Sequence, residues 1–189
     1  MKDLSRRVLT AIFSFAVFPL AFFMGAFRHY VITPGEVYFP DDLSIKQLIE
    51  NLVNNPNSAD ELLQIFNLTK PYAIAFVVLF VLTLLSAATI FVISIVSYKR
   101  KAIHCIAWLG MSCFFVANLL FFEISDVILN NSIDLGAAFG NNISDVTGGA
   151  EYHVYMTDGI RFISKALLVT AFVNIEPKKK KAEPEEKKD

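Results

Sequence analysis

The chain has 189 residues, of which 54% are hydrophobic, and its mean hydropathy is +0.50. This hydropathy is too high for an ordinary soluble domain and is typical of a small membrane protein with one compact domain. The formal net charge is −1, so no overall basic field indicates nucleic acid as a partner. Both cysteines lie in an apolar run, which excludes a disulfide framework in the polar loops.

Residues 9–27 form the first apolar run, which is long enough to cross a bilayer as a helix. The preceding MKDLSRR would also suit a signal peptide, but the run is rather long for one and no clear small-x-small cleavage site follows it. We therefore expect an uncleaved first span. Pro19 lies inside it and is expected to kink the helix, which membrane helices tolerate.

The segment 28–71 is patterned, and its first part is typical of a β-hairpin. Two β-prone stretches, 29–33 and 36–39, flank the pair Pro34-Gly35, which is typical of a turn. We therefore expect a short hairpin directly after the first span.

Two short amphipathic helices are predicted after this hairpin. The first has Asp41 or Asp42 as its N-cap and ends at Pro56, and the second begins with Ser58 and Glu61 spaced as a capping box. Their apolar faces must pack against each other, the hairpin, the membrane surface or a partner. We predict a partner-binding surface made of apolar residues from the two helices: Leu48, Leu52, Leu62 and Phe66.

Residues 72–97 form the second and most apolar run, and residues 103–122 form the third. The turn SYKRKA between them holds three basic residues, at 99–101. Such a short turn predicts that the two spans are antiparallel neighbours.

The segment 123–157 is predicted to form a second outer loop. Its beginning continues the helical pattern of the third span, and its glycine-rich middle, 132–150, is expected to be mobile. Residues 151–156 alternate apolar and polar side chains, which is typical of a strand. This strand could pair with the first hairpin and make a three-stranded sheet above the helices.

The basic residues predict the topology. The N-terminus, the 99–101 turn and the tail after residue 176 hold three, three and six of the 17 basic residues, whereas 123–157 holds none. Basic flanks of membrane spans stay on the cytoplasmic side. The tail can join the other two clusters only if residues 158–175 also cross, so the charge pattern predicts a fourth span and places both termini in the cytoplasm.

The fourth predicted span carries two charges in its first half. Antiparallel packing of the third and fourth spans would bring these charges close to polar residues at the outer end of the third. We therefore predict an intramembrane polar cluster near the outer rim, formed by Asn118, Glu123, Arg161 and Lys165. The alternative is that Lys165 only extends its long stem toward the headgroups.

Three glycosylation sequons begin at Asn67, Asn130 and Asn142, and all lie in the predicted outer loops. The tail, 176–189, is charged and is expected to be disordered and cytoplasmic. Four lysines directly follow the fourth span and are expected to be attracted to anionic lipid: Lys178, Lys179, Lys180 and Lys181.

No pattern in the chain predicts catalysis. A phosphate-binding glycine loop, a nucleophile elbow and an HExxH helix are all missing from the sequence. His29 and His153 lie on two predicted strands, but two ligands without a cysteine are a weak signal for zinc. We therefore expect no enzyme activity, no metal and no cofactor.

The predicted fold is an all-α membrane protein, a four-transmembrane-helix bundle with a small outer β/α loop subdomain. Four spans with both ends inside, a larger first outer loop, a very short inner turn and a smaller second outer loop resemble the claudin and peripheral myelin protein superfamily in layout. That superfamily has a tryptophan motif and a cysteine pair in its first loop. Here the only tryptophan, Trp108, lies in the third span and the first loop lacks cysteine, so no binding residue is carried over.

The expected function is non-catalytic. We expect a membrane protein of the plasma membrane or secretory pathway that acts through its outer loops, as an adhesion or junction component or an accessory subunit of a larger complex. Its expected partners are membrane lipids and another protein. The first alternative is a small transporter or channel subunit with a polar site between the third and fourth spans. The second is a lipid-modifying or sorting protein of internal membranes.

Overall fold

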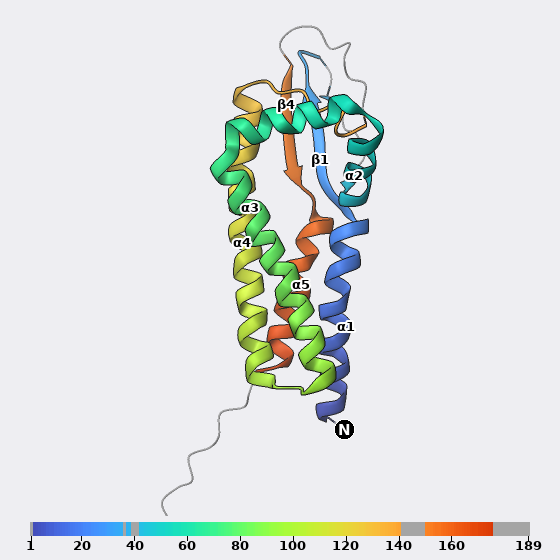
Figure 1. The fold of residues 1–189 in the computed structure, drawn as a ribbon, viewed down its shortest axis with the longest axis vertical. Helices are drawn as coiled ribbons and strands as arrows, with labels where there is room; N and C mark the ends of the chain where they lie inside the picture. Colours follow the sequence, from blue (N-terminus) through green and yellow to red (C-terminus); the bar gives the residue numbers. More distant parts are fainter. Residues whose placement is uncertain (1, 36, 39–41, 141–149, 176–189) are drawn as a thin grey trace, which may run out of the picture.

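The computed structural model describes residues 2–35, 37–38, 42–140 and 150–175, and the structural statements below concern these residues. Its main body is a bundle of four helices with a small sheet at one end (Figure 1). Neighbouring helices in the bundle are α1 with α3 and α5, and α4 with α3 and α5. The helices are α1 (Lys2–Phe23), α3 (Pro56–Val96), α4 (Arg100–Asn130) and α5 (Asp158–Val173).

Three of these helices, α1, α3 and α4, are long and apolar enough to cross a membrane. The chain is therefore compatible with a multi-pass membrane protein, and it is mostly helical as predicted. Helix α5 has 16 residues, which corresponds to about 24 Å. It packs against α1 and α4 inside the bundle (Figure 1). The predicted fourth crossing itself stays a prediction.

Large apolar side chains cover the outside of the bundle, whereas small residues lie at its helix contacts. Ala87, Ala107 and Gly110 are buried. A Cβ atom at position 110 would lie 2.8 Å from the Cβ of Ser86, so a glycine here lets α3 and α4 approach closely. The outward-facing side chains include Phe15, Val77, Leu85, Leu109 and Phe115.

The sheet has four strands: β1 (Gly25–Ile32), β2 (Val37–Tyr38), β3 (Leu43–Ser44) and β4 (Glu151–Met156). Strand β4 runs antiparallel to β1 along six residue pairs, from Phe27↔Met156 to Ile32↔Glu151, and β2 and β3 pair with the other edge of β1. The predicted hairpin and its pairing with the 151–156 strand are thus confirmed, whereas β3 was not foreseen. Strand β1 begins at Gly25, so residues 25–27 belong to the sheet and not to the first span.

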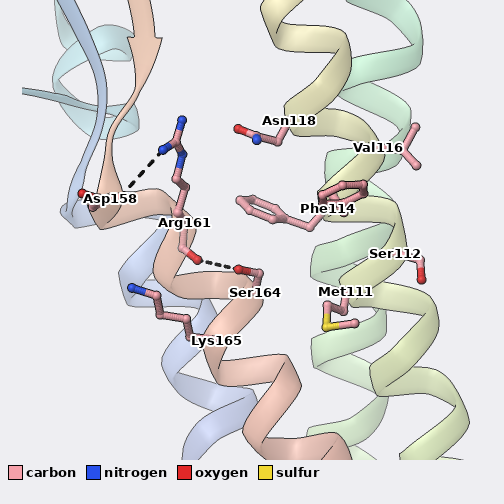
Figure 2. A pocket seen from close by; sticks show the side chains of 10 residues that line it. Met111, Ser112, Phe114, Val116, Asn118, Asp158, Arg161, Ser164 and Lys165 are labelled. Carbon is pink, nitrogen blue, oxygen red and sulfur yellow. Dashed lines mark hydrogen bonds and ion pairs between the residues drawn. The ribbon is translucent and has the colours of Figure 1, made fainter.

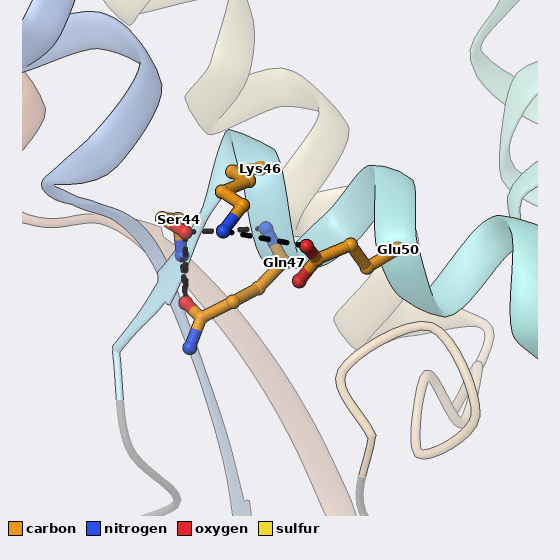
Figure 3. A network of polar contacts seen from close by, with 4 residues as sticks. All are labelled: Ser44, Lys46, Gln47 and Glu50. Atoms are coloured by element: carbon orange, nitrogen blue, oxygen red, sulfur yellow. Dashed lines mark hydrogen bonds and ion pairs between the residues drawn. The ribbon is translucent and has the colours of Figure 1, made fainter.

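Helix α2 (Ile45–Asn54) begins with a capping box, whereas the sequence analysis predicted an aspartate cap for this helix. Ser44 is its N-cap: the Ser44 hydroxyl accepts the backbone N–H of Gln47, and the Gln47 side chain accepts the Ser44 N–H (Figure 3). The prediction of Asp41 or Asp42 as the cap is wrong, since Asp42 instead pairs with Arg28 at 2.6 Å.

The second predicted amphipathic helix is the outer part of α3. Its N-cap is Asn55, with Pro56 as the first helical residue, so the Ser58–Glu61 capping box is wrong. The helix is kinked at Thr69 (φ −112°, ψ 15°), two residues before Pro71. A proline inside a helix lacks an N–H and its ring clashes with the preceding turn, which accounts for the kink. Before it, residues 56–68 cross in front of β1 and β4 in the view of Figure 1, and Leu62 and Ile65 line a cavity together with Phe27 and Val154 of these strands.

Candidate functional site

A groove of about 500 Å³ lies between α4 and α5 near the sheet (Figure 2). It is lined by three members of the predicted polar cluster: Asn118, Arg161 and Lys165. The fourth, Glu123, is exposed and does not line it. The ion pair of Arg161 within the described residues is with Asp158, at 3.8 Å, on its own helix. The structure thus brings three of the four residues to one groove and leaves Glu123 outside.

The two cations of α5 differ in direction. Figure 2 shows Arg161 beside the space between α5 and α4, with the Asn118 amide pointing toward that space from α4. The Arg161 Nε is buried and has no hydrogen-bond partner among the described residues. The amine of Lys165 lies on the side of α5 away from α4 (Figure 2), 4.8 Å from the centroid of the Phe162 ring. Arg161 is therefore the cation available to a ligand in the groove.

A second cavity, of about 660 Å³, lies over the sheet and shares Asp158 and Arg161 with the first. The pair Arg28–Asp42 lines it, as do the phenols of Tyr30 and Tyr155. The Tyr30 hydroxyl donates to the Tyr155 hydroxyl at 2.9 Å. Burial raises the pKa of Tyr30 to about 12, so its phenol stays protonated at neutral pH and remains a donor.

The two predicted outer loops are joined by a clasp around Glu61. Its carboxylate accepts the backbone N–H groups of Ala137, at 3.1 Å, and Ala138, at 2.8 Å. The Ser58 hydroxyl donates to the Ala137 carbonyl at 2.8 Å, and the Asn51 amide donates to the Ala138 carbonyl at 3.1 Å. Burial raises the pKa of the Glu61 carboxyl group. The two N–H donors lower this pKa, but by less than burial raises it. The clasp holds residues 137 and 138 against α2 and α3. The expected mobility of the glycine-rich segment stays a prediction.

His29 is fully buried, and its ring contacts those of Phe139 and Tyr152 at centroid distances of 5.1 and 6.1 Å. Neither ring nitrogen has a hydrogen-bond partner within the described residues. Burial lowers the pKa of His29 to about 4, so the ring is neutral at neutral pH.

The two histidines of the sheet do not meet. His153 pairs in register with Tyr30, the neighbour of His29, and stacks on the Tyr30 ring at 4.9 Å. Successive side chains of a strand point to opposite faces, so His29 and His153 lie on opposite faces of the sheet. Among the described residues there is no group of three His, Cys, Asp or Glu side chains that could hold a metal ion.

The residues predicted to bind a partner have different surroundings. Leu48 and Leu62 line a small apolar cavity of about 110 Å³, and Leu52 is half-buried. Phe66 is exposed. The exposed apolar side chains that the sequence analysis missed on the same two helices are Ile49, Val53 and Leu63, with exposed fractions of 46%, 78% and 56%. The i to i+4 spacing of Ile49 and Val53 indicates that both lie on one face of the helix. Spacing alone does not indicate which face of the helix packs inward.

The remaining predicted sites are the glycosylation sequons and the tail lysines. Asn67 is exposed on α3 and Asn130 is exposed at the end of α4. Asn142 lies outside the described residues, as do the tail lysines Lys178, Lys179, Lys180 and Lys181.

At the opposite end of the bundle from the sheet, basic side chains bind carbonyls in the last turn of α3 and just after α5. Arg7 donates to the carbonyls of Ser94 and Ile95 at the end of α3, and Arg100 donates to the carbonyl of Ile175 after α5. Cations at helix C-termini satisfy free carbonyls and oppose the helix dipole. These contacts bring the N-terminal segment, the α3–α4 turn and the end of α5 to one end of the bundle.

A buried contact supports the same arrangement. The Asn174 amide donates to the Thr10 hydroxyl at 2.8 Å and to the Thr170 carbonyl at 2.8 Å. Both Asn174 and Thr10 are fully buried. This contact fixes the end of α5 against the beginning of α1.

Comparisons with models of protein families, with curated proteins and with solved structures find no match to this chain. The layout-based resemblance to claudins and peripheral myelin proteins therefore stays a prediction.

The burial of neutral His29 predicts a loss of stability at mildly acidic pH. Because its folded pKa of about 4 lies below the ordinary 6.5, the unfolded state binds a proton more readily, and stability falls as pH drops from 6.5 toward 4. The expected loss is up to about 3 kcal/mol. The measurement is thermal unfolding of the detergent-solubilised protein at several pH values. His29→Leu should lack this component of the pH dependence, while His153→Gln, on the other sheet face, should retain it. An equal pH dependence in wild type and His29→Leu contradicts the prediction.

Proposed function

We propose that the protein is a four-span membrane protein, with both termini on the cytoplasmic face, that binds a partner protein through its outer subdomain. The support for four crossings is the contact of the N-terminal segment, the α3–α4 turn and the end of α5 at one end of the bundle. This end carries the basic residues that cytoplasmic flanks collect. Helix α5, at about 24 Å, is shorter than a bilayer core of about 30 Å, and slight thinning of the bilayer can accommodate the difference.

The proposed location is the plasma membrane or a membrane of the secretory pathway. In this topology Asn67 and Asn130 lie on the outer side, and both are exposed. The lysines that follow residue 177 lie on the cytoplasmic side, where anionic lipids attract basic segments. The role is a non-catalytic one.

The observation that carries the partner proposal is the exposed apolar face of α2. No residue of α2 is fully buried. Ile49 and Val53 lie about one turn apart on the same face of the helix, with exposed fractions of 46% and 78%. Leu63 and Phe66 are exposed on the outer part of α3, which contacts α2. Because the Glu61 clasp and the sheet hold both helices, this apolar face is presented on a fixed support. Exposed apolar surface on fixed elements suits protein binding.

The partner is proposed to be another membrane protein, with this chain as its accessory subunit or as an adhesion or junction component. A binding surface above the bilayer can meet either a neighbour in the same membrane or a protein of an apposed one. Native purification followed by identification of co-purifying chains separates these two cases, because a neighbour co-purifies from one membrane preparation.

The test of the partner proposal compares two double variants of α2. Ile49→Ser with Val53→Ser should reduce the co-purifying chain by about tenfold, since apolar anchors at an interface are each worth on the order of 1 kcal/mol or more. The matched control is Lys46→Ser with Glu50→Ser, which removes the exposed ion pair of the same helix (Figure 3). Retention of the partner by the apolar variant, or equal loss in the control, contradicts the proposal.

The test of the topology is labelling of intact cells with a membrane-impermeant reagent. Tags placed before Met1 and after Asp189 should be protected until the cells are permeabilised, whereas a tag inserted in segment 141–149 should react from outside. A tag after Asp189 that reacts in intact cells overturns the four-span proposal.

A second candidate function is a transporter or channel subunit, favoured by the groove that Asn118, Arg161 and Lys165 line. Solute flux into liposomes that is lost in Asn118→Leu, with partner binding intact, would favour this function over the first.

A further inference from the structure

The groove between α4 and α5 and the cavity over the sheet meet at the outer end of α5. Asp158 and Arg161 line both of them, so the two hollows adjoin at these residues and are together called the depression. Its two ends differ in chemistry: the wall on α4 is mostly apolar, and the part over the sheet is lined by an ion pair and phenols. The apolar wall consists of Met111, Phe114, Phe115 and Val116.

We propose that this depression binds a phospholipid of the outer leaflet, with its phosphate at Arg161, one acyl chain along α4 and its headgroup over the sheet. The inference rests on the proposed placement of α5 in the membrane, but not on the partner surface, which lies on α2 and the outer part of α3.

The state of Arg161 indicates an anionic ligand. Its Nε is buried without a hydrogen-bond partner among the described residues, and its ion pair with Asp158 is long, at 3.8 Å, with the Asp158 side chain 92% exposed. Such an exposed pair contributes little. A guanidinium presents a planar fork of donors that matches two phosphate oxygens. The Asn118 amide points toward the same space from α4 and can add a donor (Figure 2).

The position of Arg161 indicates a lipid and not a free phosphate. Arg161 lies in the first turn of α5, where the bundle gives way to the sheet: β4 ends at Met156 and α5 begins at Asp158. In the proposed topology this is the level of the outer headgroups. Below it, Phe115 and Val116 are 61% and 43% exposed, so an acyl chain can cover them.

Charges on the sheet side suit a polar headgroup. Arg28 and Asp42 pair at 2.6 Å, and Asp158 and Arg161 lie beside them in the same hollow. The hollow therefore contains both signs of charge along with the hydroxyls of Tyr30 and Tyr155. A headgroup with a phosphate and further polar groups can replace the water that these side chains would otherwise bind.

The first experiment measures lipid retention by native mass spectrometry. The full chain is released from nanodiscs that contain phosphatidylcholine, phosphatidylethanolamine and phosphatidylglycerol in equal amounts. Wild type and the control Lys46→Gln should each retain one phospholipid, and Arg161→Gln should retain about tenfold less, as expected for loss of a charge-assisted hydrogen-bonded contact. Equal retention by Arg161→Gln overturns the proposal. Displacement of the retained lipid by inorganic phosphate alone also overturns it, because the site would then bind the anion without the chain.

The second experiment stays valid if Arg161→Gln fails to fold. Wild type is illuminated with a phosphatidylcholine that carries a diazirine in its acyl chain close to the glycerol. Label should concentrate in residues 111–118 of α4 and 158–165 of α5. Label spread evenly over the outward faces of α1 and α3 overturns the proposal, since it indicates only bulk lipid.

Failure of this inference is distinguishable from failure of the proposed function. A tag after Asp189 that is protected in intact cells, together with no specific lipid retention, removes the lipid site and leaves the four-span topology. A tag that reacts from outside removes both. Partner capture through Ile49 and Val53 is independent of either result.

Discussion

The antiparallel pairing of β1 with β4 is the constraint on which the arrangement of the chain depends. Strand β1 begins two residues after α1 ends, and β4 is separated from α5 only by Thr157. The Thr157 N–H donates to the Ala26 carbonyl at 3.0 Å, and its hydroxyl donates to the Gly25 carbonyl. A Cβ at Gly159 would lie 2.5 Å from that Gly25 carbonyl, so the junction is close-packed. Very little chain separates the two strands from α1 and α5. The six residue pairs between β1 and β4 therefore determine that α5 lies beside α1 in the bundle.

This strand pairing at one end of the bundle also affects the contacts at its opposite end. Once α5 starts beside the outer end of α1, it can only run back along α1, and the contacts of Asn174 with Thr10 and of Arg100 with the Ile175 carbonyl follow. The basic residues that indicate topology in the sequence therefore also have a structural role, since Arg7 binds carbonyls in the last turn of α3 and Arg100 binds the Ile175 carbonyl just after α5. Charge distribution and strand pairing are independent features, and both favour placing the N-terminus, the α3–α4 turn and the end of α5 on one side.

The sequence predicted the local elements better than the contacts between them. Apolar runs located α1, α3 and α4, and period-two alternation located β4, because both signals depend on neighbouring residues alone. The caps failed for a tertiary reason: Asp42 is used by Arg28, and Ser58 and Glu61 bind the backbone of residues 137 and 138. No local pattern announces such a long-range clasp. The partner-binding residues were only partly located, because α2 and the outer part of α3 carry apolar side chains on more than one face, and spacing does not say which face is covered.

The charges of α5 explain why hydropathy leaves this helix ambiguous. Arg161 and Lys165 fall in its first two turns, directly below a strand that holds the helix from outside. At that level a cation need not enter the apolar core: the Lys165 amine lies over the Phe162 ring, and Arg161 opens toward both the groove and the sheet. The remaining eight residues of the helix contain no charge. In the proposed topology the first turn of α5 lies at headgroup level, and the long stem of Lys165 can extend its amine back toward that level from the hydrocarbon. The same placement makes Arg161 the point where a lipid phosphate and the protein can meet.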